Sequence, residues 1–263
     1  MIFLHQSFVS RLISQALIVL SVILVAVPLA MIVKVSVQGQ GLPNYAVILQ
    51  DTPFLRFLLN SAVISGATLV LVLALSTAAA YCTAILRPRG STVITVLVLA
   101  GLTMPAVALV VPVYSLVQSL GLFDTYWAVI IPLTALSIPF GFLVGGNYMR
   151  SIPVEVFEAA KLDGAGTWRT FVSVLLPLCR PILGVVAVFT FLAAWNEYLL
   201  PLLFLQDVDV KVVTQVPTYF QSQRLVDTPK VFAANVLISI PIIVFYLALQ
   251  RTFRKGLSQG AIK

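Results

Sequence analysis

Six long apolar stretches without a Lys or Arg constrain this chain more than any other feature. Each is long enough to cross a bilayer as a helix, which needs roughly 20 apolar residues at about 1.5 Å of rise per residue. Only the fifth contains an acidic residue, Glu197. The stretches are 13–33, 60–86, 92–117, 127–148, 181–205 and 231–250. The sequence therefore predicts an all-α polytopic membrane protein with six transmembrane helices.

The composition excludes other classes of protein. Hydrophobic residues make up 60% of the chain and charged residues only 10%, whereas soluble domains are about a quarter charged. The net charge of +7 is spread over the ends of apolar runs, which is typical of a membrane surface and not of a nucleic-acid interface. We therefore expect the lipid bilayer, and no nucleic acid, as a partner.

The basic residues also predict the orientation. Most of the 16 Lys and Arg residues fall in the N-terminal tail, after the second span, in segment 149–180 and in the C-terminal tail. Because basic residues concentrate on the inner side of a membrane, both termini and segment 149–180 are expected in the cytoplasm. We predict three parts: 1–59 (tail, first span and outer loop), 60–250 (core) and 251–263 (basic tail).

Segment 149–180, between the fourth and fifth spans, has the signals of two short helices. Ser151 is a candidate cap, Pro153 suits a first turn, and Glu155 and Glu158 lie where the helix dipole favours acids. The pair Asp163-Gly164 predicts the end of this first helix.

A second helix is expected after that glycine elbow. It would be capped by Thr167, run towards Leu176, and be bounded by Pro177 and Pro181. Both helices are predicted to lie in water beside the membrane.

A connection of this length points to a docking partner, because a loop between two spans needs only a few residues. Ala159 and Ala160 allow another backbone to approach closely, while Phe157 and Leu162 offer apolar contact and Glu158 a hydrogen-bond acceptor. The alternative is an amphipathic helix lying on the lipid headgroups. The acidic start of the helix argues against that, since anionic lipids repel carboxylates.

The spacing in this loop resembles the signature of binding-protein-dependent ABC importer permeases. That signature reads Glu-Ala-Ala, three residues, Gly, nine residues, Ile, one residue, Leu-Pro. The matching residues are Glu158, Ala159, Ala160, Gly164, Val174, Leu176 and Pro177, with Val174 in place of Ile. Leu59-Asn60-Ser61, Leu162-Asp163-Gly164-Ala165 and Trp195-Asn196-Glu197-Tyr198 extend the resemblance to the carbohydrate-type subfamily.

This resemblance implies a transport subunit of the inner membrane with no chemistry of its own. The chain would form the pathway with a second permease and receive a sugar or polyol from an external solute-binding protein. Two cytoplasmic ATPase subunits would complete the importer, and the loop would sit in a cleft of an ATPase. The coupling residues would be Glu158, Ala159, Ala160, Asp163, Gly164, Leu176 and Pro177. No cofactor is expected on this chain; ATP and Mg²⁺ would sit on the ATPase. Consistent with this, the sequence has no Gly-x-x-x-x-Gly-Lys-Ser/Thr phosphate loop.

The substrate pathway is predicted at Trp195, Asn196, Glu197 and Tyr198, about midway along the fifth span. A carboxylate at that depth should face protein or a water-filled cavity. The other interpretation is a hydrogen bond between helices that only holds the span in place.

Three further hypotheses concern other parts of the chain. Gly141 and Gly145 are expected to be close-packing sites. The outer segment 206–230 would contact the solute-binding protein. The tail 251–263 would anchor the chain or contact the ATPase. A secondary carrier or channel that needs no ATPase remains the competing function.

Overall fold

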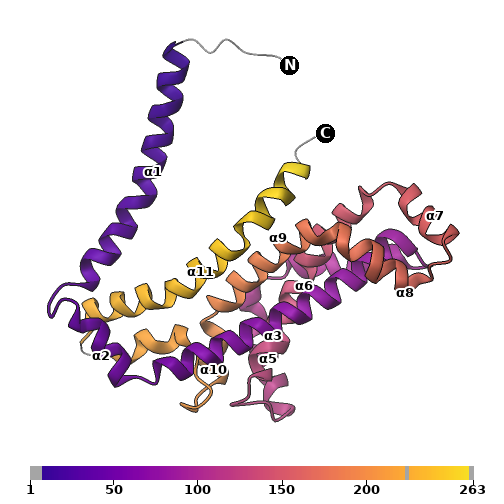
Figure 1. The fold of residues 1–263 in the computed structure, drawn as a ribbon. Coiled ribbons are helices and arrows are strands. Elements are labelled where there is room, and N and C mark those ends of the chain that lie inside the picture. Colours follow the sequence, from indigo (N-terminus) through magenta and orange to yellow (C-terminus); the bar gives the residue numbers. More distant parts are fainter. Residues whose placement is uncertain (1–7, 223–224, 261–263) are drawn as a thin grey trace. The chain divides into compact units, whose positions relative to one another are not determined.

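A computed structural model describes residues 8–222 and 225–260 of the chain, and these are nearly all helical (Figure 1). The α-helices are α1 (Phe8–Ser36), α2 (Pro43–Asp51), α3 (Phe54–Tyr81), α4 (Ser91–Ala100), α5 (Val110–Ser119), α6 (Trp127–Arg150), α7 (Val154–Leu162), α8 (Thr167–Arg169), α9 (Leu176–Trp195), α10 (Leu199–Phe204) and α11 (Thr228–Gly260). Two π-helical turns are η1 (Cys82–Leu86) and η4 (Thr170–Leu175). Short 3-10 turns are η2 (Gly101–Thr103), η3 (Ala106–Leu109) and η5 (Val213–Phe220). The predicted all-α class is confirmed.

The chain divides into two compact units. One consists of Met1–Pro53 with Val216–Ser239, and the other of Phe54–Gln215 with Ile240–Lys263. The division into 1–59, 60–250 and 251–263 made from the sequence stays a prediction. The docking loop, its pocket and the predicted pathway residues lie in the second unit.

Five helices are long and apolar enough to cross a membrane. They are Leu12–Ser36, Phe54–Leu86, Trp127–Arg150, Thr167–Trp195 and Thr228–Ala248. A sixth crossing is possible if the pair Ser91–Thr103 and Ala106–Ser119 counts as one span, although the pair is bent by 98°. The described residues therefore hold five or six crossings, in agreement with the sequence.

The third span departs from the uninterrupted stretch 92–117 that was expected. Its break falls at Met104 and Pro105, both with extended backbone (ψ 121°). Pro105 has no N–H to donate, and its ring disfavours the helical conformation for the residue before it. Apolar length alone therefore did not reveal that this segment is two short helices.

The fifth span was also placed wrongly, at 181–205. The apolar helix runs over Thr167–Trp195 and ends before Asn196, and the short helix α10 follows. Leu199–Phe204 is apolar enough to read as a continuation of the span, but Glu197 and Tyr198 separate it from α9. Glu197 therefore lies at the end of the span and not halfway along it.

Helices α3, α6 and α9 pack against one another and form the core of the second unit. Gly141 of α6 lets these helices approach closely: a Cβ atom there would lie 2.6 Å from Ser76 Oγ and 3.2 Å from Val186 Cγ1. At Gly145 the nearest neighbour of such an atom is Ala80 Cβ, at 3.9 Å. The prediction of close packing is confirmed for Gly141, whereas at Gly145 a methyl group would make only an ordinary van der Waals contact.

Candidate functional site

The predicted docking helix is α7, which begins later than expected. Its first residue is Val154, and the cap position is Pro153, with no side-chain hydrogen bond. The expectation that Ser151 caps this helix is wrong, because Ser151 Oγ donates to the Tyr148 carbonyl (2.7 Å) at the end of α6. Glu155 lies in the first turn, where the helix dipole favours a carboxylate.

The glycine elbow at the end of α7 is confirmed. Ala165 N–H donates to the Ala160 carbonyl (2.9 Å), and Gly164 N–H donates to the Lys161 carbonyl (3.0 Å). These two bonds form a Schellman motif, which needs a left-handed residue directly after the cap. Gly164 has φ +74°, and a Cβ there would meet no atom within 4 Å. Glycine is therefore required here for its backbone conformation and not for space.

The second predicted helix is not a separate element. Residues Thr167–Trp195 form one long apolar helix, in which α8, η4 and α9 follow one another without a break. The cap is Gly166, without a side-chain hydrogen bond, so the expectation for Thr167 is wrong. Pro177 and Pro181 do not end the helix: both lie inside it, and Pro177 comes just after the π-helical turn η4. The loop is thus one short helix joined directly to the fifth span.

One face of α7 is buried against the chain's own helices. Phe157 and Ala160 are only 6% and 7% exposed, and Phe157 packs in a cluster with Tyr81, Met149 and Leu175. The expectation that Phe157 and Ala160 are open to a partner is therefore wrong in this structure. Residues three apart share a helix face, so the spacing of Phe157 and Ala160 already predicts that both side chains lie on the same face of α7.

The other face of α7 is exposed and is the surface left for a partner. It carries Glu158, Ala159 and Leu162, and the Leu162 side chain is 90% exposed. Trp168, at the start of the next helix, is 75% exposed. An exposed Trp of this kind is typical of a binding surface. The sequence reading did not single out Trp168, although a lone Trp among polar loop residues was visible there.

The remaining predicted loop residues are accessible to different extents. Asp163 is the exposed cap of α7, Leu176 is half-buried, and Pro177 is exposed.

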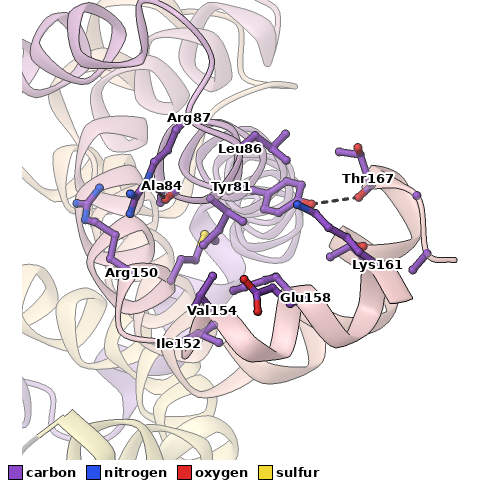
Figure 2. Close-up of a pocket in the computed structure, with 16 residues that line it drawn as sticks. Tyr81, Ala84, Leu86, Arg87, Arg150, Ile152, Val154, Glu158, Lys161 and Thr167 are labelled. Atoms are coloured by element: carbon purple, nitrogen blue, oxygen red, sulfur yellow. Dashed lines mark hydrogen bonds between the residues drawn. The ribbon is translucent and has the colours of Figure 1, made fainter. Parts of the chain in front are cut away.

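A pocket of about 610 Å³ lies between α7 and the ends of α3 and α6 (Figure 2). Its apolar lining includes Ile85, Leu86, Met149, Ile152, Val154 and Phe157. Its charged lining consists of Arg87, Arg150, Glu158 and Lys161. Tyr81 closes one side and donates from its hydroxyl to the Thr167 carbonyl (3.2 Å).

The predicted pathway residues are engaged with nearby backbone. Trp195 is buried and stacks on Phe191 with ring centroids 5.4 Å apart. Asn196 Nδ2 donates to the Leu192 carbonyl (2.9 Å). Glu197 Oε1 accepts the N–H of Leu200 (3.0 Å). The Glu197 carboxylate therefore satisfies a free amide in the first turn of α10, where the helix dipole favours a negative charge.

Tyr198 and the surrounding space complete this region. The Tyr198 side chain is 41% exposed. A void of about 10 Å³, lined by Ser61, Ser65, Trp195 and Glu197 among others, is the cavity next to these residues.

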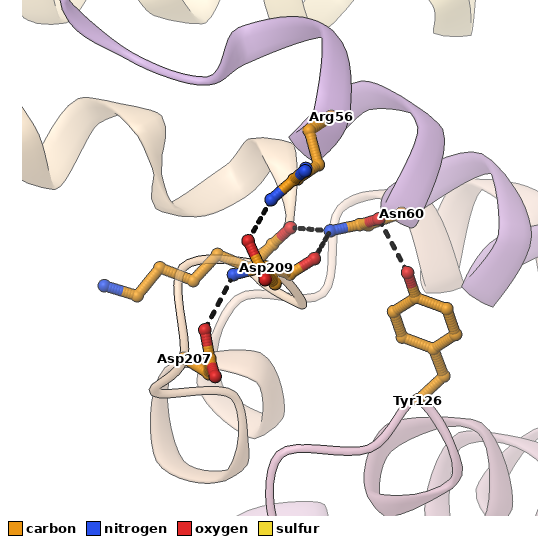
Figure 3. Close-up of polar contacts among 6 residues, drawn as sticks. Arg56, Asn60, Tyr126, Asp207 and Asp209 are labelled. Carbon is orange, nitrogen blue, oxygen red and sulfur yellow. Dashed lines mark hydrogen bonds and ion pairs between the residues drawn. The ribbon is translucent and has the colours of Figure 1, made fainter.

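A polar network on the opposite end of α3 was missed by sequence reasoning (Figure 3). Asn60 Nδ2 donates to the carbonyls of Asp209 (2.9 Å) and Lys211 (2.7 Å), and Asn60 Oδ1 accepts from the Tyr126 hydroxyl (2.7 Å). Arg56 forms an ion pair with Asp209. Asn60, which is buried, thus fixes the outer segment 206–215 to α3.

The remaining predictions concern the basic tail and metal binding. In the tail 251–263, helix α11 continues to Gly260, but the side chains of the tail and residues 261–263 lie outside the described part. Among the described residues, no group of three or more His, Cys, Asp or Glu is placed to hold a metal ion.

Residues 76–259 match the family described as "Binding-protein-dependent transport system inner membrane component". The chain belongs to this family. It is therefore a multi-pass permease of the cell membrane and a subunit of a binding-protein-dependent importer. Permeases of this family generally lack an ATPase site of their own and work with ATPase and binding-protein partners.

Relatives and solved structures agree with this assignment. The permease is 34% identical to the diacetylchitobiose uptake system permease protein NgcG of Streptomyces coelicolor, over 95% of this chain and 88% of the relative. It is 31% identical to the trehalose/maltose transport system permease protein MalG of Thermococcus litoralis, over 84% and 81%. Its fold resembles a chain of a bacterial ABC transporter that imports alginate, with TM-score 0.78 and 21% identity, covering 94% and 98% of the two chains.

Proposed function

We propose that this permease carries a sugar, an oligosaccharide or a polyol, and that a second, non-identical permease completes the pathway. The names of relatives that cover most of the chain support this substrate class, since they refer to diacetylchitobiose and to trehalose and maltose. In this proposal both termini and α7 lie in the cytoplasm, as the distribution of basic residues favours.

The loop after α6 couples the permease to one subunit of a pair of ATPases, which bind ATP and Mg²⁺. Glu158, Ala159 and Leu162 form the contact surface, with Asp163 at its edge and Trp168 beside it. Gly164 sets the elbow, and Leu176 and Pro177 lie in the apolar helix that follows. Phe157 and Ala160 act from the inner face, because they fix α7 to the bundle.

One observation carries this proposal: α7 is buried on one face against the chain's own helices and open on the other. Phe157 packs on Tyr81 of α3, Met149 of α6 and Leu175 of η4. Because interiors are close-packed, a displacement of α7 moves these helices with it. ATP binding then favours one arrangement of the permease by making different contacts in the two states.

On the outer side, segment 206–230 receives the solute-binding protein. Asn60 supports this role because it holds the first part of the segment against α3. Asn196 and Tyr198 are the exposed members of the pathway group and are the candidates for contact with sugar hydroxyls and rings.

The docking proposal is tested by copurification of the ATPase with the tagged permease. Glu158→Lys and Gly164→Asp are expected to leave membrane insertion intact and to reduce the bound ATPase about tenfold or more. The first change removes a charge-assisted contact, and the second places a side chain at the left-handed elbow that orients α7. Asp51→Lys is the charge-reversal control, since Asp51 is an exposed acid of α2 and lies outside the loop. Undiminished ATPase in both variants, or equal loss in the control, contradicts the proposal.

The competing function, a carrier that needs no ATPase, makes a different prediction. Membrane vesicles that hold the permeases without the ATPase subunits are expected to show no uptake of sugar. Uptake in such vesicles, or uptake that follows a proton gradient, would show that the permease works alone.

A further inference from the structure

Two arginines line the pocket beneath α7 from the ends of two different spans. Arg87 directly follows the apolar helix Phe54–Leu86, and Arg150 is the last residue of Trp127–Arg150. Arg87 has a left-handed backbone (φ 48°) and donates from Nε to the Ala84 carbonyl (2.9 Å). Arg150 donates from Nη2 to Asn147 Oδ1 (2.7 Å). Both guanidinium groups are therefore held in place by neutral oxygens.

The charge of the pocket is not balanced. Among the described residues, Arg87 and Arg150 form no ion pair with a carboxylate. The other charged groups of the lining are Lys161 and Glu158, which belong to α7 and lie on the opposite side from the two arginines (Figure 2). Three cations thus face a single carboxylate, and the excess positive charge is on the wall formed by η1 and the end of α6.

The rest of the lining is apolar and the space is large. Leu86, Met149 and Ile152 lie beside the arginines in a pocket of about 610 Å³, within the range of roughly 300–1,000 Å³ that is common for bound small molecules. Apolar walls lower the local dielectric constant and strengthen the attraction of an anion. A planar guanidinium matches a phosphate through two parallel hydrogen bonds.

We propose that this pocket binds the phosphate group of an anionic phospholipid between Arg87 and Arg150. The position at the ends of two membrane-spanning helices is where headgroups lie, and basic pockets between such helices suit them. The apolar walls and the volume fit a headgroup with its glycerol better than free phosphate, which shares the same chemistry. The site adjoins the proposed ATPase surface, because Glu158 belongs to that surface and also lines the pocket, on the side opposite the two arginines.

The test measures lipid that stays bound to the assembled importer. The importer is purified from nanodiscs of phosphatidylglycerol mixed with phosphatidylcholine, and retained lipid is counted by native mass spectrometry. Arg87→Gln/Arg150→Gln is expected to retain at least tenfold less phosphatidylglycerol per copy of this chain, since each arginine contributes a charge-assisted hydrogen bond. Arg89→Gln is the matched control, because Arg89 is an exposed arginine of the same turn that does not line the pocket.

A second measurement separates the two sources of phosphate. Thermal stabilisation of the importer is recorded with inorganic phosphate and with chloride at equal ionic strength. If phosphate stabilises the importer, if this effect disappears only in the double variant, and if retained lipid does not change, the phosphate site is supported. Its ligand is then free phosphate. The proposal is overturned if the double variant matches Arg89→Gln in both measurements. It is also overturned if the double variant loses the ATPase while retaining its lipid, because the arginines would then serve an acidic partner surface.

Discussion

Replacing Gly141 by Ala tests whether close approach of the helices depends on the missing side chain. A Cβ at this position lies 2.6 Å from Ser76 Oγ, 3.0 Å from Ser76 Cβ and 3.2 Å from Val186 Cγ1. Rotation of Ser76 relieves only the first of these contacts. Overpacking of this kind costs about 1–3 kcal/mol, while Gly→Ala inside a helix gains up to about 1 kcal/mol. We expect a net loss of about 1 kcal/mol in the free energy of unfolding.

Gly66→Ala is the control that measures the gain in helix propensity by itself. Gly66 lies in α3, and a Cβ there would meet no atom within 4 Å, so this variant keeps the gain without the clash. Reversible unfolding in mixed micelles should therefore place the two variants about 1–3 kcal/mol apart. Adding Ser76→Gly to Gly141→Ala should recover part of the loss, as expected for coupled neighbours. Equal stability of the Gly66 and Gly141 variants would refute the reasoning.

Three further predictions concern polar groups. Asn60→Ala removes three hydrogen bonds worth about 0.5–1.5 kcal/mol each, so hydrogen exchange in segment 206–215 should speed up at least tenfold; unchanged exchange contradicts the tether. Glu197→Gln keeps the acceptor for the Leu200 N–H but removes the charge, whereas Glu197→Ala removes both. If sugar uptake changes only in Glu197→Ala, the role of Glu197 is structural; if it changes in both variants, Glu197 belongs to the pathway. A hydrogen bond from Lys230 lowers the pKa of Asp227. Protection from hydrogen exchange at the start of α11 should therefore be full above pH about 3.8 and decrease as the pH falls below that value. In Asp227→Asn this decrease should be absent.

The sequence was sufficient for features that depend on local chemistry or on length. Long apolar runs predicted the helices, and the pair Asp163-Gly164 predicted the end of α7 at the correct residue, because a Schellman motif is a local structure. The small residues of α6 predicted its close packing. Each of these follows from neighbours within a few turns of the chain.

The misplaced features depend on partners elsewhere in the fold. Leu199–Phe204 has the composition of a span, and only the contact of Glu197 with the start of α10 shows that a new helix begins there. The network around Asn60 joins residues about 150 positions apart, for which an isolated sequence carries no signal. The spacing of Phe157 and Ala160 puts them on one face of α7, but it does not say whether that face packs against the chain's own helices or against a partner.

The two π-helical turns have a consequence for how this loop can change. Because a π turn closes each hydrogen bond one residue later than an α turn, it acts as a one-residue insertion that rotates whatever follows about the helix axis. The turn η1 comes directly before Arg87, and η4 comes directly before Leu176. Deleting one residue from η1 would turn Arg87 away from its present direction and would shorten the apolar span by only that residue. Helical register, and not only side-chain identity, therefore determines which groups this end of the permease presents.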